Sequence, residues 1–195
     1  MSQLSLFSAD QTAPSAADLA GLLAAAGQVV AVGGQARVSV VVADEWRADA
    51  IAAMIAGTGL IAQRGISDEG SPVVGTAPSP ALLPLAQEWT RGAVKLAPPT
   101  WVPGPRAVRL WALASGRADD EDVLRYELGL DPHSPESYST LATALMRTGV
   151  APTLIGTRGS HPALRVSGRR RLTRLVEMIG EPPVDPAAYS AWPLV

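Results

Sequence analysis

The sequence predicts an internally duplicated α+β fold in which each half runs helix, strand, strand, helix, strand, strand, helix. Residues 51–60 (IAAMIAGTGL) align with residues 141–150 (LATALMRTGV), and both have the pattern of an amphipathic helix ending in Thr-Gly. Glycine suits the left-handed conformation that terminates helices. Four prolines between residues 96 and 105 disfavour a helix or central strand there and divide the chain into halves of similar length.

In the first half, the Gly33-Gly34 pair lies between two strand-like segments and favours a tight hairpin turn. The segments around it alternate between strand-like and helix-like patterns. The predicted helices are residues 16–26, 45–56 and 80–89, and the predicted strands are residues 29–32, 37–42, 60–64 and 72–76.

The sequence of the second half predicts a similar order of helices and strands. Ser134 followed by Pro135 is a favourable N-cap and first-turn pair for a helix. In the last helix, Leu172 and Leu175 match two leucines of the first half, Leu82 and Leu85, at the same 90-residue offset. The predicted helices are residues 106–115, 135–148 and 169–179, and the predicted strands are residues 125–130, 150–157 and 163–167.

The composition is that of a globular protein, with 47% apolar and 17% charged residues, so disorder of the whole chain is not expected. The sequence has no cysteine, no apolar run of membrane-spanning length and no secretion-signal pattern. We therefore expect a cytoplasmic protein without disulfides and without membrane contact.

The formal net charge of -2 hides an uneven distribution of charges. Residues 145–180 contain seven arginines against Glu177 alone, a balance of +6. A positive surface of this kind attracts phosphate even on a protein that is acidic overall. An ordinary solvated arginine-rich face explains the same pattern equally well.

Residues 19–27 read LAGLLAAAG, which resembles the LAGLIDADG signature of homing endonucleases at six of nine positions. The resemblance implies a pseudo-twofold duplicated LAGLIDADG-type fold, with two such helices side by side at the axis. Ala20, Gly21 and Ala24 are small enough for close helix packing. The second copy would be residues 108–116 (VRLWALASG), which keep only the Ala and Gly at the end.

The resemblance also implies where an active site would lie. Homing endonucleases of this family use a carboxylate at the end of each central helix to hold a divalent metal at the scissile phosphate. Those positions are Ala26 and Ser115 here, so we expect a protein that is not an enzyme and holds no metal or other cofactor. The acidic run at residues 119–122 is an alternative metal site, although a solvated acidic loop explains it better.

The family fold implies that the outer faces of the strands bind the major groove of double-stranded DNA. Period-two alternation turns Arg37, Arg125 and Arg165 outward, whereas Glu127 on the same face argues against DNA binding. The alternative is that these positions are merely exposed. The expected DNA contacts are Arg37, Arg125, Arg158, His161, Arg165, Arg169, Arg170 and Arg171.

The N-terminal segment Gln3-Leu4-Ser5-Leu6-Phe7 resembles the QLSLF peptide by which bacterial replication and repair proteins bind the DNA polymerase sliding clamp (beta subunit). The resemblance implies that Leu6 and Phe7 fill an apolar pocket while Gln3 anchors the peptide by hydrogen bonds. The alternative is that these side chains pack onto the body of the protein.

These observations predict a non-catalytic, nucleoid-associated DNA-binding protein that acts with the sliding clamp in bacterial replication or repair. A WhiA-like transcription regulator without a helix-turn-helix and a protein-interaction adaptor are the alternatives. The expected regions are a clamp-binding peptide and flexible linker (1–15), a first repeat (16–95), a proline-rich linker (96–105), a second repeat (106–181) and a C-terminal tail (182–195).

Overall fold

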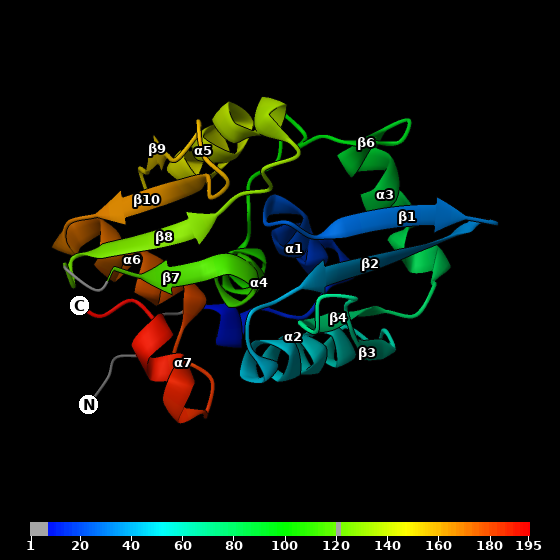
Figure 1. The fold of residues 1–195 in the computed structure, drawn as a ribbon, viewed down its shortest axis with the longest axis horizontal. Helices are drawn as coiled ribbons and strands as arrows, with labels where there is room; N and C mark the ends of the chain where they lie inside the picture. The colour runs from blue at the N-terminus through cyan, green and yellow to red at the C-terminus, as the bar shows by residue number, and fades with distance from the viewer. Residues whose placement is uncertain (1–7, 120–121) are drawn as a thin grey trace.

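The computed structural model describes residues 8–119 and 122–195, which form two four-stranded antiparallel sheets and the helices packed against them (Figure 1). The first sheet has the strand order β1-β2-β4-β3 and the second β7-β8-β10-β9. Because each order is the same permutation of four consecutive strands, the two halves share one topology, and the predicted duplicated α+β fold is confirmed. Figure 1 shows the sheets side by side, with α1 and α4 between them.

In the first half, the predicted hairpin at Gly33 and Gly34 is present, and both glycines have positive φ, 61° and 77°. The first predicted helix begins as a 3-10 turn, and Ser15 and Asp18 form a capping box at its start. The elements are η2 (Ala16–Leu19), α1 (Ala20–Ala24), β1 (Gln28–Val32), β2 (Gln35–Val41), α2 (Glu45–Gly57), β3 (Ala62–Ile66), β4 (Pro72–Thr76), η3 (Pro80–Leu82) and α3 (Leu83–Trp89).

The second half repeats this order and adds one strand that the sequence did not predict. That strand, β7, contains Gly116, Arg117 and Ala118, which have no apolar alternation, and it is defined by its pairing with β8. The elements are α4 (Pro105–Ser115), β7 (Gly116–Ala118), β8 (Arg125–Gly129), η4 (Pro135–Ser137), α5 (Tyr138–Arg147), β9 (Thr153–Ile155), β10 (Ala163–Ser167) and α6 (Arg169–Ile179).

Four further short elements lie outside the predicted pattern. A two-stranded hairpin, β5 (Thr90–Arg91) with β6 (Val94–Lys95), follows α3. The tail contains α7 (Pro186–Ala191), and the segment expected to be a flexible linker contains η1 (Ala9–Gln11). Ser8 and Ala9 are buried, so the chain is already packed against the body here rather than extending as a free linker.

The core fills the space between the inner faces of the sheets and the helices. Tyr126, Leu128, Leu164 and Val166 are fully buried, as period-two alternation predicted. The side chains that alternate with the buried ones, such as Arg37 on β2 and Arg165 on β10, lie on the outer faces of the sheets. Within the described residues, no helix is long and apolar enough to cross a membrane.

Candidate nucleic-acid interface

The central helices α1 and α4 meet at Gly21. A Cβ atom on Gly21 would lie 1.9 Å from the carbonyl oxygen of Ala107, so only glycine permits the observed distance between the two backbones. Ala20 and Ala24 are buried beside it. The predicted close packing of two helices at the pseudo-twofold axis is therefore present, with α4 as the second copy.

The C-terminal end of α4 is capped by a buried arginine from the other half. Arg47 on α2 donates hydrogen bonds to the carbonyl oxygens of Ala112 (3.2 Å), Leu113 (2.9 Å) and Gly116 (2.8 Å), and its Nε lies 3.1 Å from Asp44. The last carbonyls of a helix have no partner within the helix and carry partial negative charge, so a cation stabilises them.

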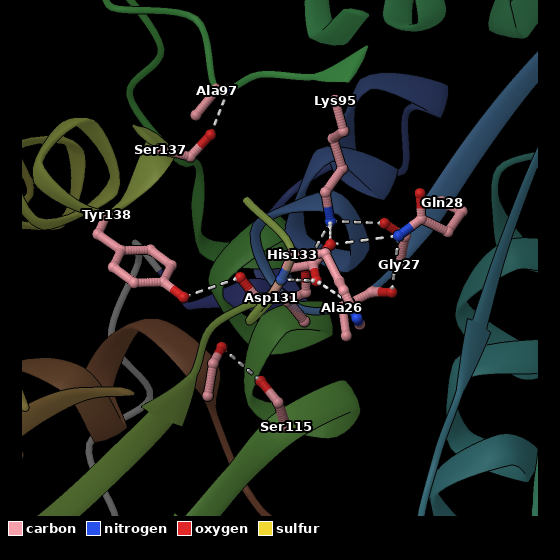
Figure 2. Close-up of polar contacts among 12 residues, drawn as sticks. Ala26, Gly27, Gln28, Lys95, Ala97, Ser115, Asp131, His133, Ser137 and Tyr138 are labelled. Carbon is pink, nitrogen blue, oxygen red and sulfur yellow. Dashed lines mark hydrogen bonds and ion pairs between the residues drawn. The ribbon is translucent and has the colours of Figure 1, made fainter. Parts of the chain in front are cut away.

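The chain that follows α1 is capped in a similar way by Lys95, the only lysine in the sequence (Figure 2). Its Nζ donates to the carbonyl oxygens of Ala25 (3.0 Å) and Gly27 (2.8 Å) and lies 2.7 Å from Asp131 Oδ2. Burial lowers the pKa of Lys95, although Asp131 acts in the opposite direction. Each central helix therefore ends on a buried cation from another part of the chain.

Asp131 is the centre of this network (Figure 2). Its carboxylate accepts from Gln28 Nε2 (3.2 Å) and from the backbone N–H of His133 (2.9 Å), and the His133 ring lies 3.2 Å away. The Tyr138 hydroxyl donates to the Asp131 carbonyl oxygen. Burial opposes ionisation of Asp131, but the hydrogen bonds from Lys95 and His133 outweigh it and lower its pKa.

The two positions at which the family has metal-binding carboxylates lie beside this network. Ala26 is exposed and has no donor atom in its side chain, and the Ser115 hydroxyl donates to the Gly129 carbonyl oxygen at 3.0 Å. The neighbouring carboxylate, Asp131, already binds Lys95. These residues do not fit a divalent cation at the helix ends, and no three acidic or histidine side chains among residues 8–119 and 122–195 cluster as a metal site elsewhere.

A row of three charged residues crosses the outer face of the second sheet. Arg117 on β7 and Arg165 on β10 both pair in register with Glu127 on β8, and both guanidinium groups hydrogen-bond its carboxylate. Glu127 is 8% exposed, whereas Arg117 and Arg165 are 60% and 34% exposed. Burial opposes ionisation of Glu127, but the two arginines outweigh it and hold its pKa below the ordinary value. The acid thus lies beneath two solvent-accessible arginines.

Arg125, at the start of β8, is engaged by the acidic loop instead. Its Nε lies 3.1 Å from the Asp122 carboxylate, and its Nη1 lies 3.8 Å from the Asp119 carboxylate. The other two acids considered for a metal site, Asp120 and Glu121, lie outside the described residues. The described part of the acidic run is therefore partnered by an arginine.

The outer face of the first sheet is much less basic. Arg37 is exposed on β2, directly opposite Val30 on β1. Val30, Val32 and Val41 are all exposed on this face. The first face therefore carries Arg37 among exposed valines and uncharged polar residues, whereas the second face carries the row of three charged residues.

The remaining predicted contacts lie at other places. Arg158 is exposed in the turn between β9 and β10, and His161, next to Ser160, precedes β10 rather than lying in it. Arg169, Arg170 and Arg171 form the exposed first turn of α6. The predicted set is thus spread over both outer faces, one turn and one helix start, and the clamp peptide Gln3 to Phe7 lies outside the described residues.

Sequence reasoning missed Arg47, Lys95, Arg117 and Asp131. The composition could have marked Lys95 as a residue with a special role, because it is a single lysine in a sequence with 15 arginines. An ammonium group is a compact charge that can approach several carbonyl oxygens at once. Arg117 was missed because β7 was missed. Nothing in the local sequence marks Arg47 or Asp131, since their partners are distant in the chain.

No protein-family model and no curated protein matches the chain. Solved structures do match it. The homing endonuclease I-WcaI bound to its DNA recognition sequence has a TM-score of 0.65 at 11% identity, over 97% of this chain and 92% of that chain. The N-terminal LAGLIDADG domain of DUF199/WhiA has a TM-score of 0.57 at 12% identity, over 86% and 83%. Full-length DUF199/WhiA from Thermatoga maritima has 0.60 at 12%, over 90% of this chain and 57% of that one. The fold is therefore LAGLIDADG-like.

These comparisons correct one expectation. From Ala26 and Ser115 we predicted that the protein is not an enzyme, and this prediction is wrong, because its structural neighbours include homing endonucleases, among them I-DmoI in complex with DNA and Ca. The residues at two positions, Ala26 and Ser115, are therefore not sufficient to conclude that a chain with this fold lacks enzyme activity.

Proposed function

We propose that the protein binds double-stranded DNA along the outer faces of its two sheets. The observation that carries this proposal is the row of Arg117, Glu127 and Arg165 across three adjacent strands. A guanidinium has five N–H donors, so an arginine that binds Glu127 keeps donors for a phosphate or a guanine edge. Glu127 fixes the two arginines in place before DNA arrives, which reduces the entropy lost on binding.

The comparisons support this proposal through the fold. I-WcaI was solved with its DNA recognition sequence and I-DmoI with DNA and Ca, and this chain has the same fold as both. On the first sheet, Arg37 is the basic contact, and the exposed valines around it are suited to thymine methyl groups rather than to phosphates. The second sheet is thus the main source of electrostatic affinity.

The test is a titration of a labelled duplex at several salt concentrations. Arg117→Ala with Arg165→Ala should weaken binding and reduce the salt slope by about 0.9 for each phosphate that is no longer neutralised. Arg91→Ala is the matched control, because Arg91 is an exposed arginine on β5, which belongs to a separate two-stranded sheet. Equal affinity and slope in both variants would overturn the assignment of these arginines.

The same titration separates the candidate functions. A replication or repair protein and a WhiA-like regulator both require salt-dependent DNA binding, whereas an adaptor does not. Duplexes of unrelated sequence then separate the first two, since a transcription regulator must prefer particular sites and each mismatched base pair costs about 1–3 kcal/mol.

We further propose that residues 3–7 bind the sliding clamp, which would place the protein in replication or repair at the nucleoid. The complete match to QLSLF supports this. Leu6→Ala with Phe7→Ala should weaken clamp binding at least tenfold, because each buried apolar side chain contributes about 1.5–3 kcal/mol and 1.4 kcal/mol is one decade. Gln11→Ala, at an exposed position outside the peptide, is the control. Duplex binding should be unchanged in both variants, and clamp binding that survives the double substitution would end the proposal.

A further inference from the structure

An arginine-lined hollow of about 680 Å³ opens where β10 ends and α6 begins. It lies between the turn after α5 and the first turns of α6. Its lining residues are Gly149, Ser167, Gly168, Arg169, Arg170, Arg171 and Arg174. Four arginines therefore line one hollow.

Few of these positive charges are neutralised by the protein. Among the residues that the structure describes, Arg169 and Arg170 make no hydrogen bond or ion pair, and Arg171 reaches only the Ser167 carbonyl oxygen at 3.4 Å. Arg174 makes two long contacts, one from its Nε to the Thr148 carbonyl oxygen (3.4 Å) and one with the Glu177 carboxylate (3.5 Å). The hollow thus has a large excess of donors that are available to a ligand.

The position of these arginines is unfavourable for the stability of the protein when no anion is bound. The start of a helix carries partial positive charge and favours acidic side chains, yet α6 begins with three consecutive arginines, has no acidic residue in its first turn and receives no side-chain cap from Gly168. Neighbouring guanidinium groups also repel one another. An anion bound in the hollow would offset both the unfavourable helix dipole and the repulsion between the arginines.

We propose that this hollow binds a phosphate group. Arginine guanidinium groups recognise phosphate through paired, charge-assisted hydrogen bonds, and four of them around one cavity suit a group with several oxygens. The phosphate belongs either to a DNA strand that passes the end of the second sheet or to a free phosphorylated ligand. Only the first source rests on the proposed function.

Pyrophosphate is the probe, measured by its effect on the thermal unfolding of the full-length chain against sodium chloride of equal ionic strength. Wild type should gain a concentration-dependent rise in Tm beyond the salt control. Replacing Arg169, Arg170 and Arg171 by Ala should raise the Kd for pyrophosphate at least tenfold. Without ligand, this triple variant should unfold at the same or a higher temperature than wild type, because the unfavourable charges are gone.

Single substitutions keep the test informative if the triple variant folds poorly. Arg170→Ala should weaken pyrophosphate binding, whereas Arg91→Ala, on β5, should not. A rise in Tm that does not exceed the salt control, or one that the arginine variants retain, would overturn the proposal.

Labelled duplex DNA distinguishes the sources. A fall in duplex affinity and a flatter salt slope in the triple variant assign the phosphate to a DNA strand, and unchanged duplex binding together with abolished pyrophosphate binding assigns it to a free ligand. Neither result depends on Arg117 and Arg165, so failure of the sheet-face proposal is detected separately.

Discussion

Lys95 Nζ lies 2.7 Å from Asp131 Oδ2, in a buried ion pair that joins the hairpin at the end of the first half to the segment after β8 in the second. Lys95 also donates to the two backbone carbonyls that follow α1. The Lys95 side chain therefore connects the end of α1, in the first half, to Asp131 in the second half. The ion pair and these hydrogen bonds lie beside Ala26 and Ser115, where the residues do not fit a divalent metal.

Asp131→Asn should destabilise the fold by about 3–5 kcal/mol, because removal of one partner leaves the other charge buried and uncompensated. Chemical denaturation at neutral pH measures the change in the free energy of unfolding. Asp49→Asn is the control, since Asp49 is 67% exposed and pairs with Arg64 at the surface, where an ion pair contributes about 0–1 kcal/mol. Similar destabilisation in the two variants would show that Lys95 has another partner or is not buried in solution.

Arg47→Met should destabilise the protein by about 1–3 kcal/mol for each carbonyl oxygen that loses its donor, chiefly those of Leu113 and Gly116, because the Ala112 oxygen still accepts from the backbone N–H of Gly116. Methionine keeps most of the apolar volume, so the destabilisation reports the hydrogen bonds rather than a cavity. Arg64→Met removes an arginine from the same half without unpairing any buried carbonyl, and a change below about 1 kcal/mol is expected. A tolerated Arg47→Met would mean that water replaces the guanidinium.

Gly21→Ala tests the contact between the central helices. The added Cβ would lie 1.9 Å from the Ala107 carbonyl oxygen, so α1 and α4 would have to separate. Overpacking in a core costs about 1–3 kcal/mol, and here the obstacle is backbone that cannot change rotamer. Gly65→Ala is the matched control, since nothing lies within 4 Å of its added Cβ. Equal stability of the two variants would contradict the close approach.

Local signals predicted much of the fold correctly. The helix over residues 169–179 and the strand over 163–167 have the predicted bounds, because apolar periodicity there agrees with the observed core. Strand β7 could not be predicted, since three residues without alternation become a strand only by pairing with β8. The duplication was visible as a repeat in order, although the halves differ in almost every outward-facing residue.

The candidate site was only partly predictable for the same reason. Arg165 and Glu127 were identified on one face by period-two alternation, but their direct ion pair depends on the register between β8 and β10. Lys95 and Asp131 meet across distant parts of the chain, and no spacing in the sequence shows that a lysine will be buried. Residues that act through long-range contacts were therefore the ones missed.

The stability of the second sheet should depend on acid pH through Glu127. Its pKa is below the ordinary value of 4.5, so the ionised carboxylate stabilises the folded state above that value, and this stability is lost as the pH falls through the lowered pKa. Asp131, whose pKa is also lowered from 3.8, adds to the same effect. Wild-type Tm should therefore fall steadily as the pH is lowered below about 4.5.

Glu127→Gln separates the contribution of this carboxylate from the rest. The variant should have a lower Tm than wild type at neutral pH, because Arg117 and Arg165 lose their shared charged acceptor. Its Tm should fall less than that of wild type below pH 4.5, because the titrating group is gone and only the other carboxylates still take up protons. Glu177→Gln, at an exposed pair with Arg174, is the control and should follow the wild-type profile. Parallel curves for wild type and Glu127→Gln would show that Arg117 and Arg165 do not hold the carboxylate in its charged form, and the preorganised arginine row would then lose its physical basis.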